Sequence, residues 1–471
     1  MKRPASLQLP HLRSLPRPQN LGELQLDRID IWFRNVLNQP DQLRQRVAFA
    51  LSEIMVVSEI GALVQAPYAL GSYYDMLAQH AFGNFRDLME EVTLHPAMGV
   101  YLSMLGNEKP DPVRNIRPDE NYARELMQLF TIGLVELDID GSVITDGQGA
   151  PVPTYNQEII EGFAHVYTGW NYAGAPSFDQ ARRNDNNQTV SMQLYPAFHD
   201  TGSKTLLNGV TLPAGQTGDQ DLRDALDNIF EHPNVGPFLA TRLIQRLVTS
   251  NPSPEYVSRV ATTFNGNQDG VRGDLGAVVK AILMDPEART AAASQISGKL
   301  KEPLLRLTQL WRAYDAHSGD GDYRFRNPNI VFGQGPLQSP SVFNFFSPFY
   351  APPGEIRDAG LVAPELQIAT EFQNTIVTNF FFLQIFGLNS QTPGLRGGDI
   401  FIDIDEEVAL AADSDVLIDR VTDKLLGGRI SDSLRTEILG MVERVPETDT
   451  VLRAAEVIYL VASSPEFARQ H

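Results

Sequence analysis

Residues 117–133 read RPDENYARELMQLFTIG and predict an amphipathic helix. Pro118 suits a first helical turn, and Gly133 suits a helix exit because glycine tolerates a left-handed backbone. The apolar side chains of this stretch recur at helical spacing, which predicts that they face a core; they are Tyr122, Leu126, Leu129 and Phe130. The stretch sets the expectation of a mainly α-helical chain.

The polar face of the same predicted helix carries Asn121, Arg124 and Glu125. One interpretation is the solvated face of an amphipathic helix. The other is a polar cleft, in which Glu125 performs acid–base catalysis while Asn121 and Arg124 bind the substrate. The sequence leaves both interpretations open.

Four further stretches share a pattern in which a helical run ends at a polar residue followed by proline. They are His95-Pro96, His232-Pro233, Asp285-Pro286 and Ser464-Pro465. Proline disfavours helical geometry in the residue before it but is well placed to open the next helix. The pattern therefore predicts helix-to-helix corners, and with them a large multi-helix array of αα-hairpins in orthogonal or bundle-like packing.

Two regions depart from helical periodicity. Residues 191–212 contain short β-prone runs and the pair Asn208-Gly209, which predict a small β-hairpin. Residues 318–360 are rich in aromatic residues, glycine and proline, and predict a long loop. We also predict that the proline-rich residues 1–20 are extended and that residues 21–471 form one large helical domain.

Composition limits the classes of function. The 471-residue chain has a net charge of −20 and a pI near 4.8, so repulsion from phosphates opposes nucleic-acid binding. The absence of cysteine excludes disulfides, thiolate metal sites and a cysteine nucleophile. No export signal is visible at the N-terminus. Residues 372–395 are uncharged but contain several amide side chains, so we interpret them as a buried helix and expect no membrane span.

Residues 154–170 read TYNQEIIEGFAHVYTGW and predict a second helix. Thr154 followed by Gln157 has the spacing of a capping box, in which each side chain satisfies a backbone donor at the helix start. Trp170 follows the helix, either as a core anchor or as the wall of a substrate-binding pocket.

The polar face of this second helix carries Glu158, Glu161 and His165 at spacings of three and four. Such a face either is solvated or presents carboxylate and imidazole ligands to zinc or iron. A divalent metal is therefore the one cofactor that these residues suggest.

Residues 198–209 read FHDTGSKTLLNG and place His199, Asp200 and Lys204 around one turn. An aspartate beside a histidine can hold the tautomer of the ring and raise its basicity, as a general base requires. A turn also favours aspartate for local hydrogen bonding alone. We weigh a catalytic His199 and Asp200, with Lys204 binding the substrate, against a purely structural turn.

Residues 265–276 copy the early positions of a calcium-binding loop, but the last position is Gly276 where a bidentate glutamate is required. We therefore predict a loop in which Asp274 caps the following helix. The sequence contains no nucleophile elbow, phosphate-binding loop or dinucleotide fingerprint.

These motifs make the chain resemble a bacterial family known as domain of unknown function 1800. The resemblance runs from about Leu26 to Phe467 and rests on ENYARELMQLFTIG, TGW, FHDTGSKTLLNG, GPLQSPSVFNFFSPFYAPPG and YLVASSPEF, in that order. It implies a mostly helical bacterial protein that is frequently exported to the periplasm or beyond. It also implies a partner protein that resembles sulfatases or alkaline phosphatases.

The matched positions of the family pattern are Glu120, Asn121, Arg124, Glu125, Gly169, Trp170, His199, Asp200, Lys204 and Pro340. The chain also departs from the pattern. Relatives carry histidines in the helix that corresponds to residues 44–59, where this chain has none, and His165 stands where a small or basic residue is expected.

Two hypotheses follow. The first is an extracytoplasmic enzyme with hydrolase-like acid–base chemistry, whose polar cleft combines Glu125, His199 and Asp200. The second is a non-enzymatic binding or assembly protein, in which the polar residues form buried networks and the aromatic residues 343–350 contact a partner. The two differ in whether Glu125 and His199 converge in one cleft.

Overall fold

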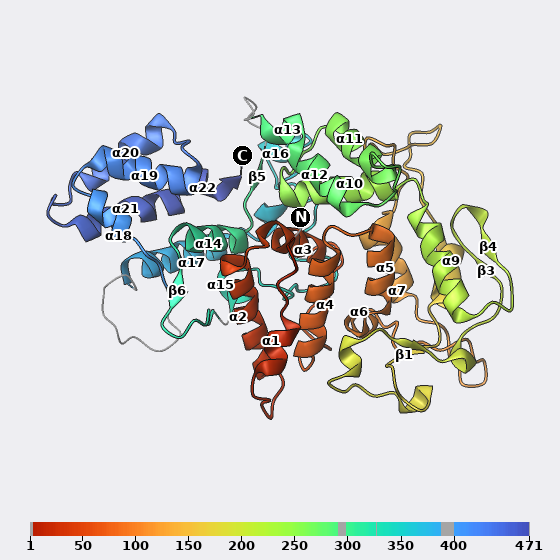
Figure 1. The fold of residues 1–471 in the computed structure, drawn as a ribbon. Helices are drawn as coiled ribbons and strands as arrows, with labels where there is room; N and C mark the ends of the chain where they lie inside the picture. The colour runs from red at the N-terminus through yellow and green to blue at the C-terminus, as the bar shows by residue number, and fades with distance from the viewer. Residues whose placement is uncertain (1–2, 291–297, 326, 388–399, 471) are drawn as a thin grey trace. The chain divides into compact units, whose positions relative to one another are not determined.

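The computed structural model describes residues 3–290, 298–325, 327–387 and 400–470. These ranges contain 22 α-helices, and their only sheets are two-stranded and antiparallel (Figure 1). The predicted fold class, mainly α with a small β-hairpin, is confirmed.

The described residues group into two compact units. Unit 1 comprises residues 1–25, 43–293 and 339–344, and unit 2 comprises residues 26–42, 294–338 and 345–471. Each unit is therefore assembled from segments that are separated along the chain. The single domain over residues 21–471 stays a prediction, because compactness of each unit does not test whether the two fold together.

Unit 1 holds all or most of each of the following helices: α1 Leu9–Ser14, α3 Gln42–Ser52, α4 Pro67–His80, α5 Phe85–Leu94, α6 Pro96–Tyr101, α7 Asn121–Glu125, α8 Gln157–Val166, α9 Gly218–Phe230, α10 Val235–Leu247, α11 Pro254–Asn265, α12 Leu275–Met284 and α13 Pro286–Arg289. It also holds the π-helix η1 Leu126–Thr131, the 3-10 turns η2 Phe178–Gln180, η3 Asn187–Thr189, η4 Pro196–Phe198 and η5 Leu207–Gly209, and the strands β1 Trp170–Asn171, β2 Gln193–Leu194, β3 Lys204–Thr205 and β4 Thr211–Leu212.

Unit 2 holds all or most of each of the following helices: α2 Glu23–Asn38, α14 Pro303–Ala313, α15 Pro328–Phe332, α16 Glu355–Asp358, α17 Glu371–Phe382, α18 Asp405–Leu410, α19 Ser414–Leu426, α20 Asp432–Val442, α21 Thr450–Ser463 and α22 Pro465–Ala468. It also holds the 3-10 turn η6 Pro364–Gln367, the π-helix η7 Leu383–Gly387 and two sheets, β5 Lys299–Leu300 with β8 Arg469–Gln470 and β6 His317–Ser318 with β7 Ile400–Phe401.

The proline-rich lead-in is not extended throughout, contrary to our prediction, because it contains α1. Proline opens this helix at its first turn, where a missing N–H costs no hydrogen bond. The buried Asp75 carboxylate accepts hydrogen bonds from the backbone N–H groups of Gln8 and Leu9, at 2.6 and 2.8 Å. Leu12 is fully buried, so the lead-in is part of the unit 1 core.

The predicted helix-to-helix corners are confirmed. His95 Nδ1 accepts from the backbone N–H of Ala97 at 3.1 Å between α5 and α6, and His232 Nδ1 accepts from Asn234 at 3.2 Å between α9 and α10. At the other two corners a side-chain oxygen accepts the hydrogen bond from a backbone N–H group at the start of the next helix. Asp285 caps α13 and Ser464 caps α22.

The β-hairpin forms inside the predicted residues 191–212. Lys204 pairs with Leu212 across the Asn208-Gly209 turn, beside α9 (Figure 1). The run near residue 193 instead pairs as β2 with β1. The sequence reading missed a set of isolated antiparallel bridges over residues 134–153. The N–H of Ile144 donates to the carbonyl of Glu136, and the N–H of Val152 donates to the carbonyl of Ile144.

The predicted helix at residues 117–133 is shorter than expected. It begins at Asn121, whose backbone N–H donates to Asp119 at 2.8 Å, and it widens into the π-helix η1 directly after Glu125. Thr131 Oγ1 donates to the carbonyl of Leu126, five residues back. Gly133 then ends the helix with φ +75°, as predicted.

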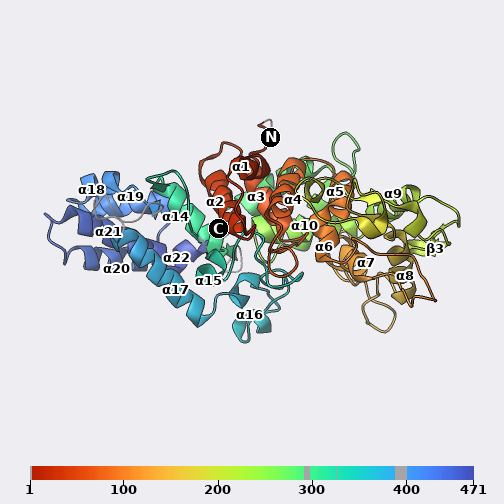
Figure 2. The same ribbon diagram turned by 90° about the horizontal axis from the view of Figure 1, so that it is seen from below.

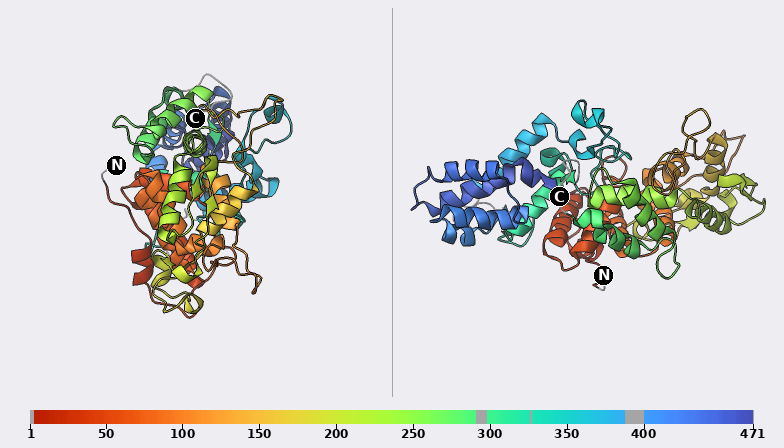
Figure 3. Two further views of the ribbon diagram at one scale, coloured as in Figure 1. Left: turned by 90° about the vertical axis from the view of Figure 1, so that its right-hand side faces the viewer. Right: turned by 90° about the horizontal axis from the view of Figure 1, so that it is seen from above.

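In unit 2 the C-terminal helices α18 to α22 pack against one another as a small bundle (Figure 3). Helix α17 begins the uncharged stretch, and our expectation that it is buried is wrong over much of its surface. Phe372 and Leu383 are 63% and 60% exposed, and only Val377 and Phe381 of α17 are buried. The end of that stretch, residues 388–395, lies outside the described residues. Among the described helices, none is long and apolar enough to cross a membrane.

Candidate functional site

Helices α7 and α8 lie side by side in unit 1 and carry the polar residues that the sequence singled out (Figure 2). The rings of Tyr122 and Tyr167 pack edge to face between them, with centroids 5.0 Å apart. Helix α8 begins two residues later than the predicted capping box would require, because its N-cap is Asn156, which accepts from the N–H of Ile159 at 3.2 Å. The predicted cap Thr154 is therefore wrong, and its hydroxyl donates to the carbonyl of Gly133.

His165, near the end of α8, forms a pair with Asp200. Its Nδ1 is hydrogen-bonded to Asp200 Oδ2, and the two side chains are 31% and 20% exposed. Asp200 Oδ1 also accepts from the N–H of Gly202 at 2.7 Å. The hydrogen bond from His165 is the main reason why the pKa of Asp200 falls from 3.8 to about 2.

His199, next to Asp200 in sequence, belongs to a different cluster. Its Nε2 lies 2.9 Å from Asp221 Oδ2, and its Nδ1 lies 3.0 Å from the carbonyl of Thr168. Lys204 Nζ donates to the same Asp221 oxygen at 2.6 Å. The side chains of His199, Lys204 and Asp221 are at most 2% exposed. The expected pairing of His199 with Asp200 is wrong, and His199 has no nitrogen left for a substrate.

The His165–Asp200 pair and the His199–Lys204–Asp221 cluster are joined by hydrogen bonds between side chains and backbone groups. Thr168 Oγ1 accepts from the N–H of Asp200 at 2.9 Å and donates to the carbonyl of His165 at 2.7 Å. Lys204 Nζ also donates to the carbonyls of Asp200 and Gly202, at 2.6 and 2.9 Å. The predicted substrate-binding Lys204 is thus buried, and it holds the turn that carries Asp200.

A line of polar contacts connects the exposed faces of α7 and α8. Arg124 donates to Glu120 at 3.0 Å, and Gln157 Nε2 donates to both oxygens of Glu120 at 3.0 Å and to Glu161 at 3.3 Å. Asn121 is exposed. Gln157, Glu161 and His165 are four residues apart, so they occupy one face of α8.

Glu125 differs from these surface residues because it is only 6% exposed. Its Oε2 has no hydrogen-bond partner among the described residues, and the same is true of the buried Oη of Tyr155. Burial raises the pKa of Glu125, with partial opposition from Arg124. Burial also raises the pKa of Tyr155 to about 12, an effect to which the charge of Glu125 adds.

Trp170 is 3% exposed and lines a hollow of about 430 Å³, with Met192 and Leu222 as apolar neighbours and Glu90 and Asp219 as acids. The buried indole Nε1 has no hydrogen-bond partner among the residues that the structure describes. Trp170 is therefore buried, as a core anchor would be, and it also borders a hollow; a substrate-binding role for it stays a prediction.

The loop that resembles a calcium site is closed by its own hydrogen bonds. Asn267 Oδ1 accepts from the N–H groups of Asp269 and Val271, both at 2.9 Å, and its Nδ2 donates to Asp274 at 2.7 Å. Asp274 caps α12 through the N–H of Ala277 at 3.0 Å, as predicted. Across the described residues, no group of three or more histidine, aspartate or glutamate side chains is placed to hold a metal ion, and this includes Glu158, Glu161 and His165.

The sequence reading missed three residues of these clusters. Asp221 resembles an ordinary acid in the first turn of a helix, and Tyr155 precedes α8 without a motif. His165 was noticed as a metal ligand rather than as the partner of Asp200. Only the FHD triplet signalled that a histidine and an aspartate meet near this turn.

Comparison with protein families gives a match over residues 5–469 to the family described as protein of unknown function DUF1800. Comparison with curated proteins and with solved structures gives no match. Because the family match spans nearly the whole chain, this protein belongs to the DUF1800 family.

Proposed function

We propose that this protein is an enzyme with hydrolase-like acid–base chemistry, centred on the His165–Asp200 pair of unit 1. One observation carries the proposal. His165 is hydrogen-bonded to Asp200 through Nδ1, while Nε2 has no hydrogen bond among the described residues and the side chain is 31% exposed. A histidine held in this way presents its second nitrogen as a general base.

The proposed role of Asp200 is to stabilise protonated His165. Its low pKa keeps the carboxylate ionised at neutral pH, so it stabilises the positive charge that His165 gains when it takes a proton. The buried His199, Lys204 and Asp221 support the turn that carries Asp200 and act as positioning residues. This assignment replaces His199 by His165 as the base.

Glu125 is the proposed second acid–base group. Burial raises its pKa, which favours a protonated carboxyl able to donate a proton to a leaving group. Arg124 is 40% exposed beside it in sequence and, with the exposed Asn121, offers donors to an anionic or carbohydrate-like substrate. Trp170, which lines the hollow of about 430 Å³, is the proposed apolar contact for the substrate.

Hydrolysis assays test the proposal. We would incubate purified protein at pH 5 to 9 with the p-nitrophenyl acetate, phosphate, sulfate and β-glucoside, and compare His165→Ala with wild type. The expected result is turnover of one of these esters or glycosides, with kcat/KM reduced about 100-fold or more in His165→Ala, as loss of a general base predicts.

His317→Ala is the matched control, because His317 is exposed and its Nδ1 lies near a backbone carbonyl rather than a carboxylate. It should leave both turnover and melting temperature unchanged. If no substrate is turned over, or if both histidine variants lose activity equally, the enzyme assignment is wrong.

The second candidate is a binding or assembly protein, and exposed aromatic side chains favour it. Phe343 and Phe349 are 58% and 69% exposed within the aromatic residues 343–350. The family resemblance suggests an extracytoplasmic partner similar to sulfatases or alkaline phosphatases. Co-purification with such a partner, lost in Phe343→Ser or Phe349→Ser but kept in His165→Ala, would favour assembly over catalysis.

A further inference from the structure

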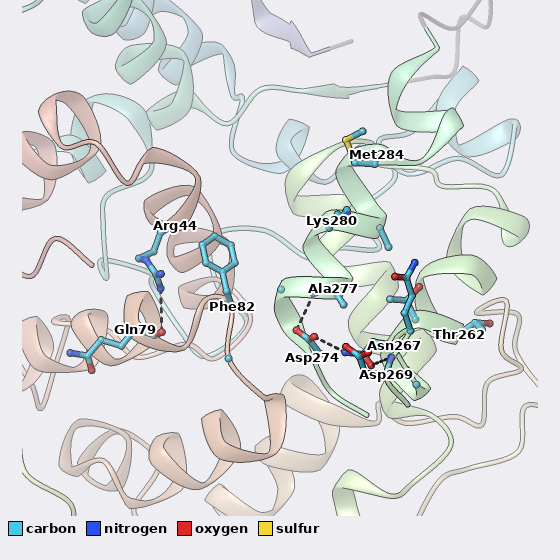
Figure 4. Close-up of a pocket in the computed structure, with 16 residues that line it drawn as sticks. Arg44, Gln79, Phe82, Thr262, Asn267, Asp269, Asp274, Ala277, Lys280 and Met284 are labelled. Atoms are coloured by element: carbon cyan, nitrogen blue, oxygen red, sulfur yellow. Dashed lines mark hydrogen bonds between the residues drawn. The ribbon is translucent and has the colours of Figure 1, made fainter. Parts of the chain in front are cut away.

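A second hollow, of about 830 Å³, lies in unit 1 and is lined by none of the residues assigned to the proposed active site. Figure 4 shows Arg44 of α3, Gln79 of α4 and Phe82, just after α4, on one wall, and residues of α11 and α12 on the other. Its volume falls within the range of about 300–1,000 Å³ that is usual for small-molecule sites.

Helix α12 is apolar on two faces, and only one of them is covered by the unit 1 core. Leu275, Val278, Val279 and Ile282 are at most 1% exposed. Ala277, Ala281 and Met284 follow one another at helical spacing on the face that lines the hollow, and Met284 is 61% exposed. Exposed apolar side chains that lie together often mark a binding surface, so this face is suited to an apolar ligand.

The acidic side chains of the hollow lie at one end of it. Both oxygens of Asp274 accept hydrogen bonds, from the N–H of Ala277 and from Asn267 Nδ2, and its charge faces the N-terminus of α12. Asp269 is exposed on the adjoining loop. Figure 4 places both acids beside Asn267, at the start of α12.

Two basic side chains, Arg44 and Lys280, line the hollow together with its apolar residues. Arg44 lies over the ring of Phe82 at 4.8 Å and donates to the carbonyls of Ala78 and Gln79, at 2.8 and 3.3 Å, which fixes its charge at the wall. Lys280 is exposed on α12, one turn before Met284, and its ammonium has no hydrogen bond or ion pair among the described residues. Apolar surface and unpaired positive charge therefore occur together.

We propose that this hollow binds an amphipathic organic anion, a molecule that joins an apolar body to a carboxylate or sulfonate. The apolar body rests on Phe82, Ala281 and Met284. The anionic group meets Lys280 within the field of Arg44. Charge complementarity selects this class at Lys280, where a cationic head group would be repelled. Asp269 and Asp274, at the other end of the hollow, would repel an anionic head group and so direct it toward Lys280.

A fluorescence titration with 8-anilinonaphthalene-1-sulfonate, an amphipathic aromatic anion, tests the site. Wild-type protein should bind it saturably, and decanoate should displace it. Lys280→Glu reverses the charge at the proposed head-group position and should weaken binding about tenfold. Ala281→Trp fills the apolar part and should abolish saturable binding while Lys280 stays in place.

Lys109→Glu is the control for net charge, because Lys109 is exposed in unit 1 and does not line the hollow. It should change the affinity by less than about twofold, as a distant exposed charge is screened. Decyltrimethylammonium, the cationic counterpart of decanoate, should not displace the probe. The proposal fails if no saturable binding occurs, if the control weakens binding as much as Lys280→Glu, or if the cation competes as well as decanoate.

Discussion

Two histidine–aspartate pairs lie together in unit 1, and they differ in their access to solvent. His199 and Asp221 are sealed, with side chains at most 1% exposed, whereas His165 and Asp200 are 31% and 20% exposed. Thr168 contacts members of both pairs. The same two residue types are therefore placed differently: the sealed pair is buried in the framework, whereas the open pair is the one that we propose exchanges protons with a substrate.

The largest expected effect comes from breaking the sealed pair. Asp221→Ala leaves the ammonium of Lys204 and the ring of His199 buried without their shared carboxylate. Removing one partner of a buried ionic cluster costs about 3–5 kcal/mol of unfolding free energy. Urea denaturation followed by circular dichroism measures it. A cost below about 1 kcal/mol would show that the cluster is not sealed in solution.

A smaller effect is expected at the open pair. The pKa of Asp200 is about 2 in the folded protein and 3.8 ordinarily, so its carboxylate adds stability above about pH 4 that is lost as pH falls through 2. Asp200→Asn should cost about 1–2 kcal/mol at pH 7, discounted for partial exposure. The difference from wild type in urea denaturation should shrink between pH 5 and pH 3. A difference that grows with acidification would contradict the low pKa.

The smallest effect tests the link between the pairs. Thr168→Val removes the hydroxyl that accepts from the N–H of Asp200 and should cost about 1 kcal/mol. A double-mutant cycle with Asp200→Asn should give a coupling energy of about 0.5 kcal/mol or more, since Thr168 holds the backbone N–H of the residue whose side chain contacts His165. Strict additivity would indicate that the open pair is held independently of Thr168.

Much of the helical framework could be predicted because its signals are local. At the corner His95-Pro96, the pyrrolidine ring of Pro96 restricts the backbone and the side chain of His95 caps the next helix. Gly133 ends its helix because glycine tolerates a positive φ. The antiparallel bridges at residues 134–153 were missed, since the paired segments are short and have turn residues between them. The prediction that helix α17 is buried failed for another reason. A sequence without charges can still leave one face of a helix exposed to solvent.

The site could be predicted only in part. Composition around residues 198–204 indicated that histidine, aspartate and lysine act together, but the partner of each was set by tertiary packing. Asp200 contacts His165, 35 residues away, and His199 contacts Asp221, 22 residues away. Neighbours in an extended turn point in different directions, so adjacency of His199 and Asp200 in sequence predicted the wrong pair.

The histidine corners have a consequence for acid tolerance that the aspartate and serine corners do not share. Burial lowers the pKa of His95 to about 3 and that of His232 to about 4, from 6.5, and each ring uses Nδ1 as an acceptor. Protonation turns that acceptor into a donor and removes the cap. The stability from these two neutral rings is complete above about pH 6.5 and is withdrawn as pH falls toward 4 and 3. Acidification therefore weakens two corners of the unit 1 framework, after Asp75, whose pKa burial raises to about 7, has already taken up a proton.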